Sequence, residues 1–445
     1  MAQWNITTQD YLNQERSLFE VNNIATRDGK VVDRFNRFPV DVLPANADAF
    51  GRTRVSAPLT LFDSSHRYRD NNLWTNLIVG TGSTVGFVTV QGLVDITVGV
   101  GSTASIIRET TKTFSYQPGK SLQILNTFVM NEPKQNLRQR VGYFGADNGI
   151  YFEVAGIGST SVSFVERSLV SGTTTETRVP QTEWNQDKLD GTGASGMTLD
   201  ITKGQIMWTD IEWLGLGTVR VGFVIDGQFI HCHSFHHANK ISSTYITTAS
   251  LPIRYEITNT GVTTSASTLK QVCSSVMSEG GYELRGLQQG IQTPVTSPVD
   301  LPTPAGNYYP VISIRLKSSP NRLDAIVILT AISLLGVTNN ANYNWQVRAS
   351  AVTTGGTWVD AGLDSAVEYK LNGGAVSGGR VLASGFLNST QQSSVPVDIL
   401  KEALFKFQLE RDGLTGTPYE LTLICSTDTA GADILAAMDW EEISR

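Results

Sequence analysis

Short runs of alternating apolar and polar residues recur along most of the chain, and most of them end in Gly, Asn or Ser. Residues 85–99, VGFVTVQGLVDITVG, are typical of these runs. Such alternation predicts strands with one buried face, because successive side chains of a strand point to opposite sides of the sheet. Turn residues recur at a spacing of about 8–12 residues, which is typical of antiparallel sandwiches and jelly rolls. The pattern therefore predicts an all-β fold.

The same pattern divides the chain into four segments. Residues 1–55 mix Asn, Asp and Arg with scattered apolar residues, and they are predicted to form an extended assembly arm. Residues 56–285 carry the strand runs of a large β-sandwich of jelly-roll or concanavalin-like type. Spaced prolines follow, and because proline removes ladder donors, residues 286–308 are predicted to be a linker. Residues 309–445 resume the strand pattern and predict a smaller C-terminal β-sandwich.

Composition supports the strand prediction and narrows the classes of partner. Charged residues make up 17% of the chain, below the roughly 25% of an ordinary soluble domain. The net charge is -7 and no Lys/Arg block occurs, so we expect no nucleic-acid partner. The most apolar window, residues 323–337, is too short to cross a bilayer, so we expect no membrane insertion. The first residues lack the basic and apolar regions of a secretion signal, which predicts synthesis in a cytoplasm.

The three cysteines are odd in number and far apart in the sequence: Cys232, Cys273 and Cys425. No Cys-x-x-Cys pair occurs, which argues against a zinc knuckle and against a disulfide framework. We therefore expect three buried free thiols in a protein made in a reducing compartment.

The clearest local element is a hairpin over residues 219–235. An Asp-Gly pair between two apolar runs suits a type I′ turn. That turn sets a register in which Gly222 faces His231 and Arg220 faces His233. The two histidines and the arginine are therefore predicted to share the sheet face opposite the core.

Four of the five histidines lie within residues 231–237, HCHSFHH. Two strand histidines at positions i and i+2 can share a metal ion, but a neighbouring arginine is a fixed cation that disfavours a divalent ion. His231 and His233 are therefore weak metal candidates. A pH-sensitive subunit contact is the second alternative, and an ordinary polar sheet face is the one we favour.

Two carboxylates lie in the run WTDIEW, residues 208–213. Asp210 and Glu212 are predicted on one face of a strand, with Trp208 beside them. Paired carboxylates near an aromatic side chain occur in glycosidase clefts, although a solvated strand face is the interpretation we favour. We keep Trp208, Asp210, Glu212, Arg220, His231 and His233 as candidates for an assembly or glycan contact.

Asp187 and Asp190 lie in a glycine-rich loop, NQDKLDGTGASG, and are weak candidates for a calcium site. The spacing of a helix–loop–helix calcium site is absent, so a plain loop is the favoured alternative. No nucleophile, base and orienting group can be assembled from the sequence. We therefore expect no catalytic residues, no cofactor and no enzymatic activity.

Four stretches resemble segments of virion structural proteins of tailed bacteriophages, a family common among marine and cyanobacterial phages. They are DAFGRTRVSAPLTLFDSSHRY (48–68), NEPKQNLRQRVGYFGADNGIYFEV (131–154), VRVGFVIDGQFIHCH (219–233) and LPIRYEI (251–257). Arg52 and Arg54, in the first stretch, join the assembly or glycan candidates. The hairpin is also similar to those of concanavalin- and laminin-G-like sandwiches, a generic likeness.

The resemblance implies a location and no mechanism. We expect a non-enzymatic virion structural protein, made in the host cytoplasm and assembled on the capsid surface, neck or tail. Its partners would be itself, as a trimer or ring, and other virion proteins. The alternative is a glycan-binding receptor module of a tail fibre or spike, with a host surface glycan as its partner. The third and least favoured function is a glycan depolymerase that uses Asp210 and Glu212.

Overall fold

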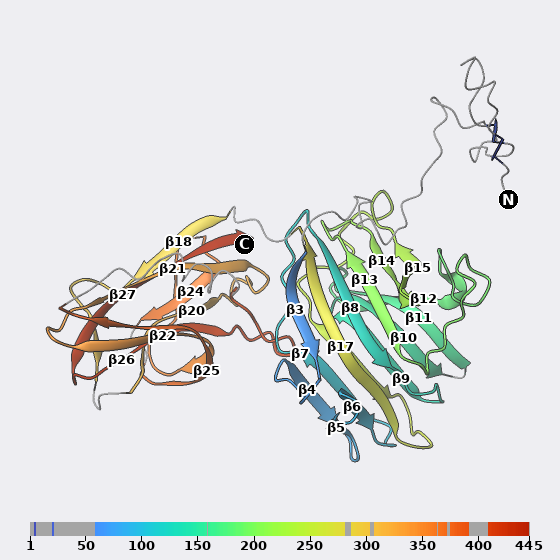
Figure 1. Ribbon diagram of the computed structural model, residues 1–445, viewed down its shortest axis with the longest axis horizontal. Coiled ribbons are helices and arrows are strands. Elements are labelled where there is room, and N and C mark those ends of the chain that lie inside the picture. Colours follow the sequence, from blue (N-terminus) through green and yellow to red (C-terminus); the bar gives the residue numbers. More distant parts are fainter. Residues whose placement is uncertain are drawn as a thin grey trace. The chain divides into compact units, whose positions relative to one another are not determined.

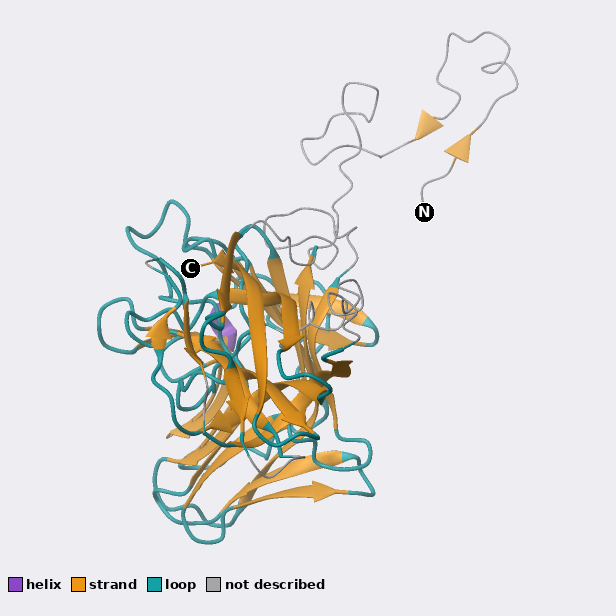
Figure 2. Cartoon of the chain, turned by 90° about the vertical axis from the view of Figure 1, so that its left-hand side faces the viewer, coloured by secondary structure: helices purple, strands orange, loops and turns teal. Residues whose placement is uncertain are grey.

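A computed structural model describes residues 4–5, 20–21, 58–157, 159–280, 286–302, 307–362, 364–371, 374–390 and 408–444. Residues 1–47 form a unit separate from residues 48–445, and within it β1 (Trp4–Asn5) pairs with β2 (Glu20–Val21). The rest of the predicted arm, with Arg52 and Arg54, lies outside the described residues. As predicted, the chain is all-β: the described residues hold 27 strands and one short 3-10 helix, η2 (Gln181–Glu183) (Figure 2).

Two antiparallel sheets, with β3 to β17 as their strands, form what we call the first sandwich (Figure 1). The seven-stranded sheet has the order β12 (Thr175–Pro180), β11 (Ser159–Ser168), β10 (Gly149–Ile157), β9 (Leu137–Phe144), β16 (Ile253–Asn259), β7 (Ser105–Thr110), β4 (Trp74–Val79). The eight-stranded sheet has the order β15 (Gln228–Phe235), β14 (Val219–Ile225), β13 (Gln205–Ile211), β8 (Ser121–Val129), β17 (Ser267–Glu279), β6 (Leu93–Val98), β5 (Thr84–Val88), and β3 (Leu59–Ser65) also pairs with β17.

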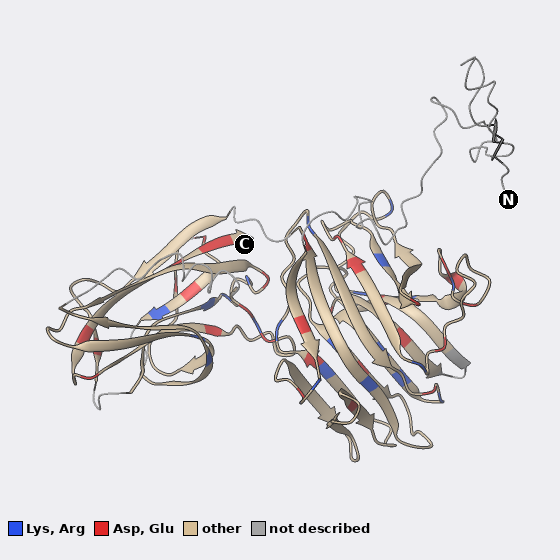
Figure 3. Cartoon of the chain, viewed as in Figure 1, with Lys and Arg blue, Asp and Glu red and all other residues tan. Residues whose placement is uncertain are grey.

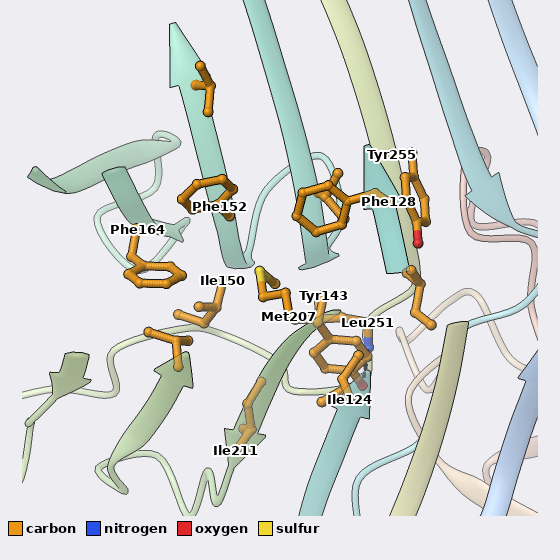
Figure 4. Packing of buried hydrophobic residues seen from close by; sticks show 14 of the residues in the cluster. Ile124, Phe128, Tyr143, Ile150, Phe152, Phe164, Met207, Ile211, Leu251 and Tyr255 are labelled. Carbon is orange, nitrogen blue, oxygen red and sulfur yellow. Dashed lines mark hydrogen bonds between the residues drawn. The ribbon is translucent and has the colours of Figure 1, made fainter. Parts of the chain in front are cut away.

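The core of the first sandwich lies between these sheets, where the apolar positions of each alternating run face inward (Figure 4). Phe152 and Phe164, from one sheet, contact Phe223 from the other, with ring centroids 5.3 and 6.0 Å away. All three side chains are fully buried. Replacing one such residue with alanine would cost about 3–5 kcal/mol, so these rings hold the two sheets together.

Two further antiparallel sheets form what we call the second sandwich, which has its own buried cluster. Its four-stranded sheet contains β18 (Leu287–Gln292), β27 (Ala432–Ser444), β19 (Val299–Leu301) and β21 (Ile326–Gly336). Its six-stranded sheet has the order β23 (Val359–Asp360), β24 (Val367–Leu371), β20 (Tyr309–Leu316), β26 (Glu420–Thr427), β22 (Asn342–Thr353), β25 (Val376–Asn388).

The segment predicted as a linker, residues 286–308, differs from that prediction. Its described residues include β18 and β19, which both pair with β27. The described prolines of the segment, Pro294, Pro298 and Pro302, fall outside these two strands, where a missing backbone donor interrupts no ladder. Spaced prolines therefore do not mark this segment as unstructured.

Candidate functional site

Four strands of the eight-stranded sheet lie side by side: β3, β17, β8 and β13 (Figure 1). Several of their outward positions carry small polar residues. The alternate residues Phe62, Ile124 and Val276 belong to the core, so the positions between them face away from it. Backbone pairing aligns these outer positions in two rows. One row is Ser65, Cys273, Thr127 and Ile206, and the next is Asp63, Ser275, Leu125 and Trp208.

These rows line an open groove with a volume of about 330 Å³. The groove-lining residues are Asp63, Ser64, Ser65, Arg67, Leu125, Thr127, Ile206, Cys273, Ser274 and Ser275. Asp63 and Arg67 are exposed and carry opposite charges, whereas Leu125 and Ile206 supply apolar surface. The groove thus combines hydroxyl groups, one carboxylate and one guanidinium around an apolar floor, and these groups can bind a small ligand rich in hydroxyls.

The groove is not evident from the sequence. Stretches such as LTLFDSS in β3 and CSSVMS in β17 place a few small polar residues among their outward positions, which is common in half-buried strands. Asp63 and Ser275 are far apart in the chain and meet only because β3 pairs with β17. Alternation within one strand gives the facing of its side chains but not which strand lies beside it.

Trp208 continues the second row but does not face solvent. Its side chain is fully buried, and its indole N–H donates to the carbonyl oxygen of Ile230 at 3.3 Å. The rings of Phe229 and His231 lie 5.9 and 5.7 Å from the indole. This burial argues against direct stacking of a sugar on Trp208.

The two carboxylates of WTDIEW are also interior groups. Asp210 and Glu212 are both fully buried, and Arg220 donates to Asp210 at 2.8 Å. Burial, together with the nearby Glu212 charge, raises the pKa of Tyr116 to about 12. A polysaccharide could not reach either carboxylate in this arrangement, so the geometry does not support a depolymerase.

The predicted hairpin forms, with β14 and β15 as its strands, and Gly222 faces His231 as expected. The predicted pairing of Arg220 with His233 is wrong. A β-bulge adds one residue to β15 next to His231, so His233 pairs with Val221, and Arg220 pairs with Ser234. A bulge changes the facing of every later residue in the strand, which places His233 beside a core residue.

The four clustered histidines have separate partners. Nε2 of His231 lies 3.2 Å from the carbonyl oxygen of His233, and Nδ1 of His233 accepts from the backbone N–H of Asn185 at 3.3 Å. His236 lies 3.3 Å from the Thr218 hydroxyl.

His237 belongs to a buried polar contact at the end of the hairpin. Its two ring nitrogens lie 2.6 Å from the Gly217 carbonyl oxygen and 2.7 Å from a Glu166 carboxylate oxygen. Its ring stacks on Tyr245 with a centroid distance of 3.8 Å. A backbone carbonyl oxygen only accepts, so Nδ1 of His237 donates to Gly217, and Nε2 lies against the Glu166 carboxylate. The cluster therefore packs the end of the sheet, with its members pointing to different partners.

Burial also makes His231 and His233 uncharged at neutral pH. Burial, with the charge of Arg220, lowers the pKa of His231 to about 4. Burial, with the nearby His236, lowers the pKa of His233 to about 4. In the unfolded chain, both side chains would titrate near the ordinary value of about 6.5.

Because the pKa values of His231 and His233 are lowered in the folded chain, we expect the protein to lose stability in mild acid. Between pH 6.5 and 4 the two imidazoles are protonated in the unfolded chain but not in the folded chain. The free energy of unfolding should therefore fall as the pH drops from 6.5 towards 4. Above pH 6.5 the imidazoles are neutral in both states, and the folded chain keeps its full stability. Each imidazole can contribute at most about 1.4 kcal/mol per pH unit. Urea unfolding at several pH values would measure the slope. The double variant His231→Gln/His233→Gln should flatten it, and an unchanged slope would contradict this assignment.

The loop carboxylates proposed for calcium are engaged by their own backbone. Asp187 accepts from the N–H groups of Leu189 and Ser195 at 2.9 and 2.7 Å. Asp190 accepts from the backbone N–H and the hydroxyl of Thr192 at 2.9 and 2.6 Å. No group of three or more His, Cys, Asp or Glu side chains in the described part of the chain is arranged to hold a metal ion. These carboxylates organise the loop.

A charged network covers the outer face of the seven-stranded sheet. Glu153 accepts from Arg140 at 2.8 Å and from Arg178 at 2.7 Å. Arg140 also reaches Glu256 at 3.2 Å, and Arg167 donates to Glu176 at 2.7 Å. The side chains of Arg140 and Glu153 are each only 4% exposed.

Aromatic rings lie within this network. Phe144, Tyr151 and Val165 form a buried cluster of their own on this outer face, and Arg167 lies over both rings at 5.4 and 5.2 Å. Burial alone would raise the pKa of Glu153, but hydrogen bonds from Arg178 and Arg140 outweigh it and hold the pKa below its usual value. Since the carboxylates and guanidinium groups of the network pair with one another, the network stabilises the sheet and offers no open ligand site.

No protein-family model matches the chain, and no curated protein matches its sequence. Solved structures that match in fold include the carbohydrate recognition domain of Emp47p, at 11% identity and a TM-score of 0.31, covering 49% of this chain and 96% of that domain. The legume lectin-like domain from Entamoeba histolytica matches at 11% identity and a TM-score of 0.29, covering 51% of this chain and 99% of that domain. A seed lectin of Lotus tetragonolobus matches at 10% identity and a TM-score of 0.29, covering 49% of this chain and 98% of the lectin. At such low identities and TM-scores, these likenesses carry no inference about ligand or activity.

Proposed function

We propose that the chain is a non-enzymatic carbohydrate-binding module and that the groove on the outer face of the eight-stranded sheet holds the sugar. The observation that carries the proposal is the lining of the groove, where hydroxyls, a carboxylate and a guanidinium surround an apolar floor. Its volume, about 330 Å³, is at the lower end of the range of small-ligand sites, about 300–1,000 Å³. A short sugar segment is the ligand that this size favours.

The chemistry of a sugar matches the lining group by group. Sugar hydroxyls both donate and accept, so they can donate to the Asp63 carboxylate, accept from Arg67 and exchange hydrogen bonds with the Thr127 hydroxyl. The C–H faces of a sugar ring are apolar and can pack on Leu125 and Ile206. Hydrogen bonds to charged groups are worth about 1.5–3 kcal/mol, so Asp63 and Arg67 should contribute most to affinity.

Binding without hydrolysis is the activity that the groove favours. Glycoside hydrolysis commonly uses two carboxyl groups on either side of the scissile bond, whereas Asp63 is the one carboxylate among the groove-lining residues. Asp210 and Glu212, the pair considered from sequence, are buried away from solvent.

A glycan array, followed by calorimetric titration of any sugar that binds, would test the proposal. Asp63→Asn keeps the shape of the side chain and removes its charge, so we expect affinity to fall about tenfold or more. Thr127→Trp should abolish binding, because an indole from β8 would fill the groove.

The control is Glu132→Gln, which removes one exposed carboxylate that does not line the groove. This variant should bind like the wild type, and all three variants should keep the β-sheet circular dichroism spectrum. The absence of any binding sugar, or equal affinity in Asp63→Asn and the wild type, would reject the groove as the site.

The setting in which the module acts stays a prediction. A host surface glycan as the ligand, a place in a phage virion, and assembly as a trimer or ring rest on the sequence resemblance. The comparisons give no support to the virion role, and the lining of the groove favours the glycan-binding alternative. Detection of the chain in purified virions would test the location directly.

A further inference from the structure

One corner of the first sandwich carries two free sheet edges. β4 ends the seven-stranded sheet and pairs with β7, and β5 ends the eight-stranded sheet and pairs with β6. The two strands are consecutive in the chain and are joined by residues 80–83. Along the free side of each strand, backbone N–H and C=O groups have no partner strand among the described residues. Such an edge is a template for pairing with another strand.

This corner lacks the features that normally keep sheet edges apart. Residues 74–94 contain no Asp, Glu, Lys, Arg, His or Pro, and Figure 3 shows β4 and β5 without charged residues. The pairing of β4 with β7 shows no bulge. Charges, prolines and bulges are the devices by which natural proteins protect free edges, and β4 has none of them.

Three other edges of the described sandwiches carry such protection. β12 contains Glu176, Arg178 and Pro180. β15 contains the bulge, and the carbonyls of His231 and Cys232 accept from backbone N–H groups of residues 186–187. β25 contains an arginine and a register shift against β22. The contrast with these three edges marks the β4 edge as a surface open to pairing.

Apolar side chains project from the same edge. Leu77, Ile78 and Val79 are consecutive in β4 and are 50%, 45% and 42% exposed. Consecutive strand residues point to opposite faces of the sheet, so apolar surface lies on both sides of the free edge. A strand added alongside would cover both sides, and burial of that surface would stabilise the contact.

We propose that β4 pairs antiparallel with β4 of a second copy of this chain, across a two-fold axis. In such an interface, each residue of the edge lies close to residues of an identical edge. A charge near the middle of β4 would therefore lie close to a like charge, which is destabilising at close range. An uncharged run suits self-pairing, whereas it gives a charged partner strand nothing to recognise. The paired strands would join two seven-stranded sheets into one continuous sheet.

Sedimentation of the full-length chain would test this proposal. The wild type should form a dimer of twice the 48.3 kDa chain mass. Leu77→Lys should raise the dimer dissociation constant by about tenfold or more, because two lysines would meet across the axis and one apolar contact would be lost. Hydrogen exchange on the wild type gives a second measurement: amides of residues 74–79 should become more protected as protein concentration rises.

The control is Phe386→Lys, which places the same charge on β25, where Phe386 is 79% exposed. This variant should dimerise like the wild type. A wild-type chain that stays monomeric, a trimer or ring unaffected by Leu77→Lys, or exchange at residues 74–79 that does not depend on concentration would each overturn the proposal. The exchange measurement decides the matter even if Leu77→Lys fails to fold.

Discussion

Glu153→Ala should lower the free energy of unfolding of the first sandwich by about 3–5 kcal/mol, the usual cost of removing one partner from a buried ion pair. Both carboxylate oxygens of Glu153 are used, one by Arg140 and one by Arg178. The Arg140 side chain is only 4% exposed, so solvent could not replace the lost carboxylate. Denaturant unfolding followed by tryptophan fluorescence would measure the change.

A matched pair at the surface of the same sandwich supplies the control. Asp95 accepts from Lys270 at 2.9 Å, and both side chains are about one-third exposed. Exposed ion pairs contribute only about 0–1 kcal/mol, so Asp95→Ala should change stability by no more than that. Equal losses in Glu153→Ala and Asp95→Ala would mean that the network is not held by its buried charges.

The second large effect is expected at Gly222, opposite His231 in the hairpin. A Cβ at this position would overlap the carbonyl oxygen of Ile230 and lie 2.9 Å from the indole nitrogen of Trp208. The same indole donates to that carbonyl oxygen, so Gly222→Ala presses on a hydrogen-bonded contact as well as on backbone. We expect a loss of about 2–4 kcal/mol, in the range of overpacked cores and broken buried hydrogen bonds.

Gly86→Ala is the control for this substitution. Gly86 lies in β5 of the same sheet, and a Cβ there would meet nothing within 4 Å. Its stability should change by less than about 1 kcal/mol, with a gain expected because alanine restricts the unfolded chain. Near-ultraviolet circular dichroism would show whether Trp208 moves in Gly222→Ala. If Gly222→Ala is as stable as Gly86→Ala, the hairpin accommodates the new Cβ without loss of free energy of unfolding, and the prediction is wrong.

Local chemistry in the sequence was sufficient for much of the architecture. Alternation predicted strands, because the side-chain period of two is a property of each strand alone. The Asp-Gly turn predicted the hairpin and its first pairs up to Gly222 and His231, because a two-residue turn fixes register close to itself. Four charged residues, Arg140, Glu153, Glu176 and Arg178, lie on β9, β10 and β12, and alternation within each strand is enough to give their facing.

Tertiary structure decided what depends on which strands are neighbours. The bulge in β15 redirected His233, and nothing in the local alternation marks it. The groove exists because β3 and β8 lie on either side of β17, and the charged network exists because β9 to β12 are adjacent. The sequence of a strand determines which of its side chains point inward, but which strand pairs with it depends on the total burial of apolar side chains in the sandwich. For this reason the sequence by itself determined strands and turns, and only the folded chain brought Asp63, Thr127 and Ser275 together.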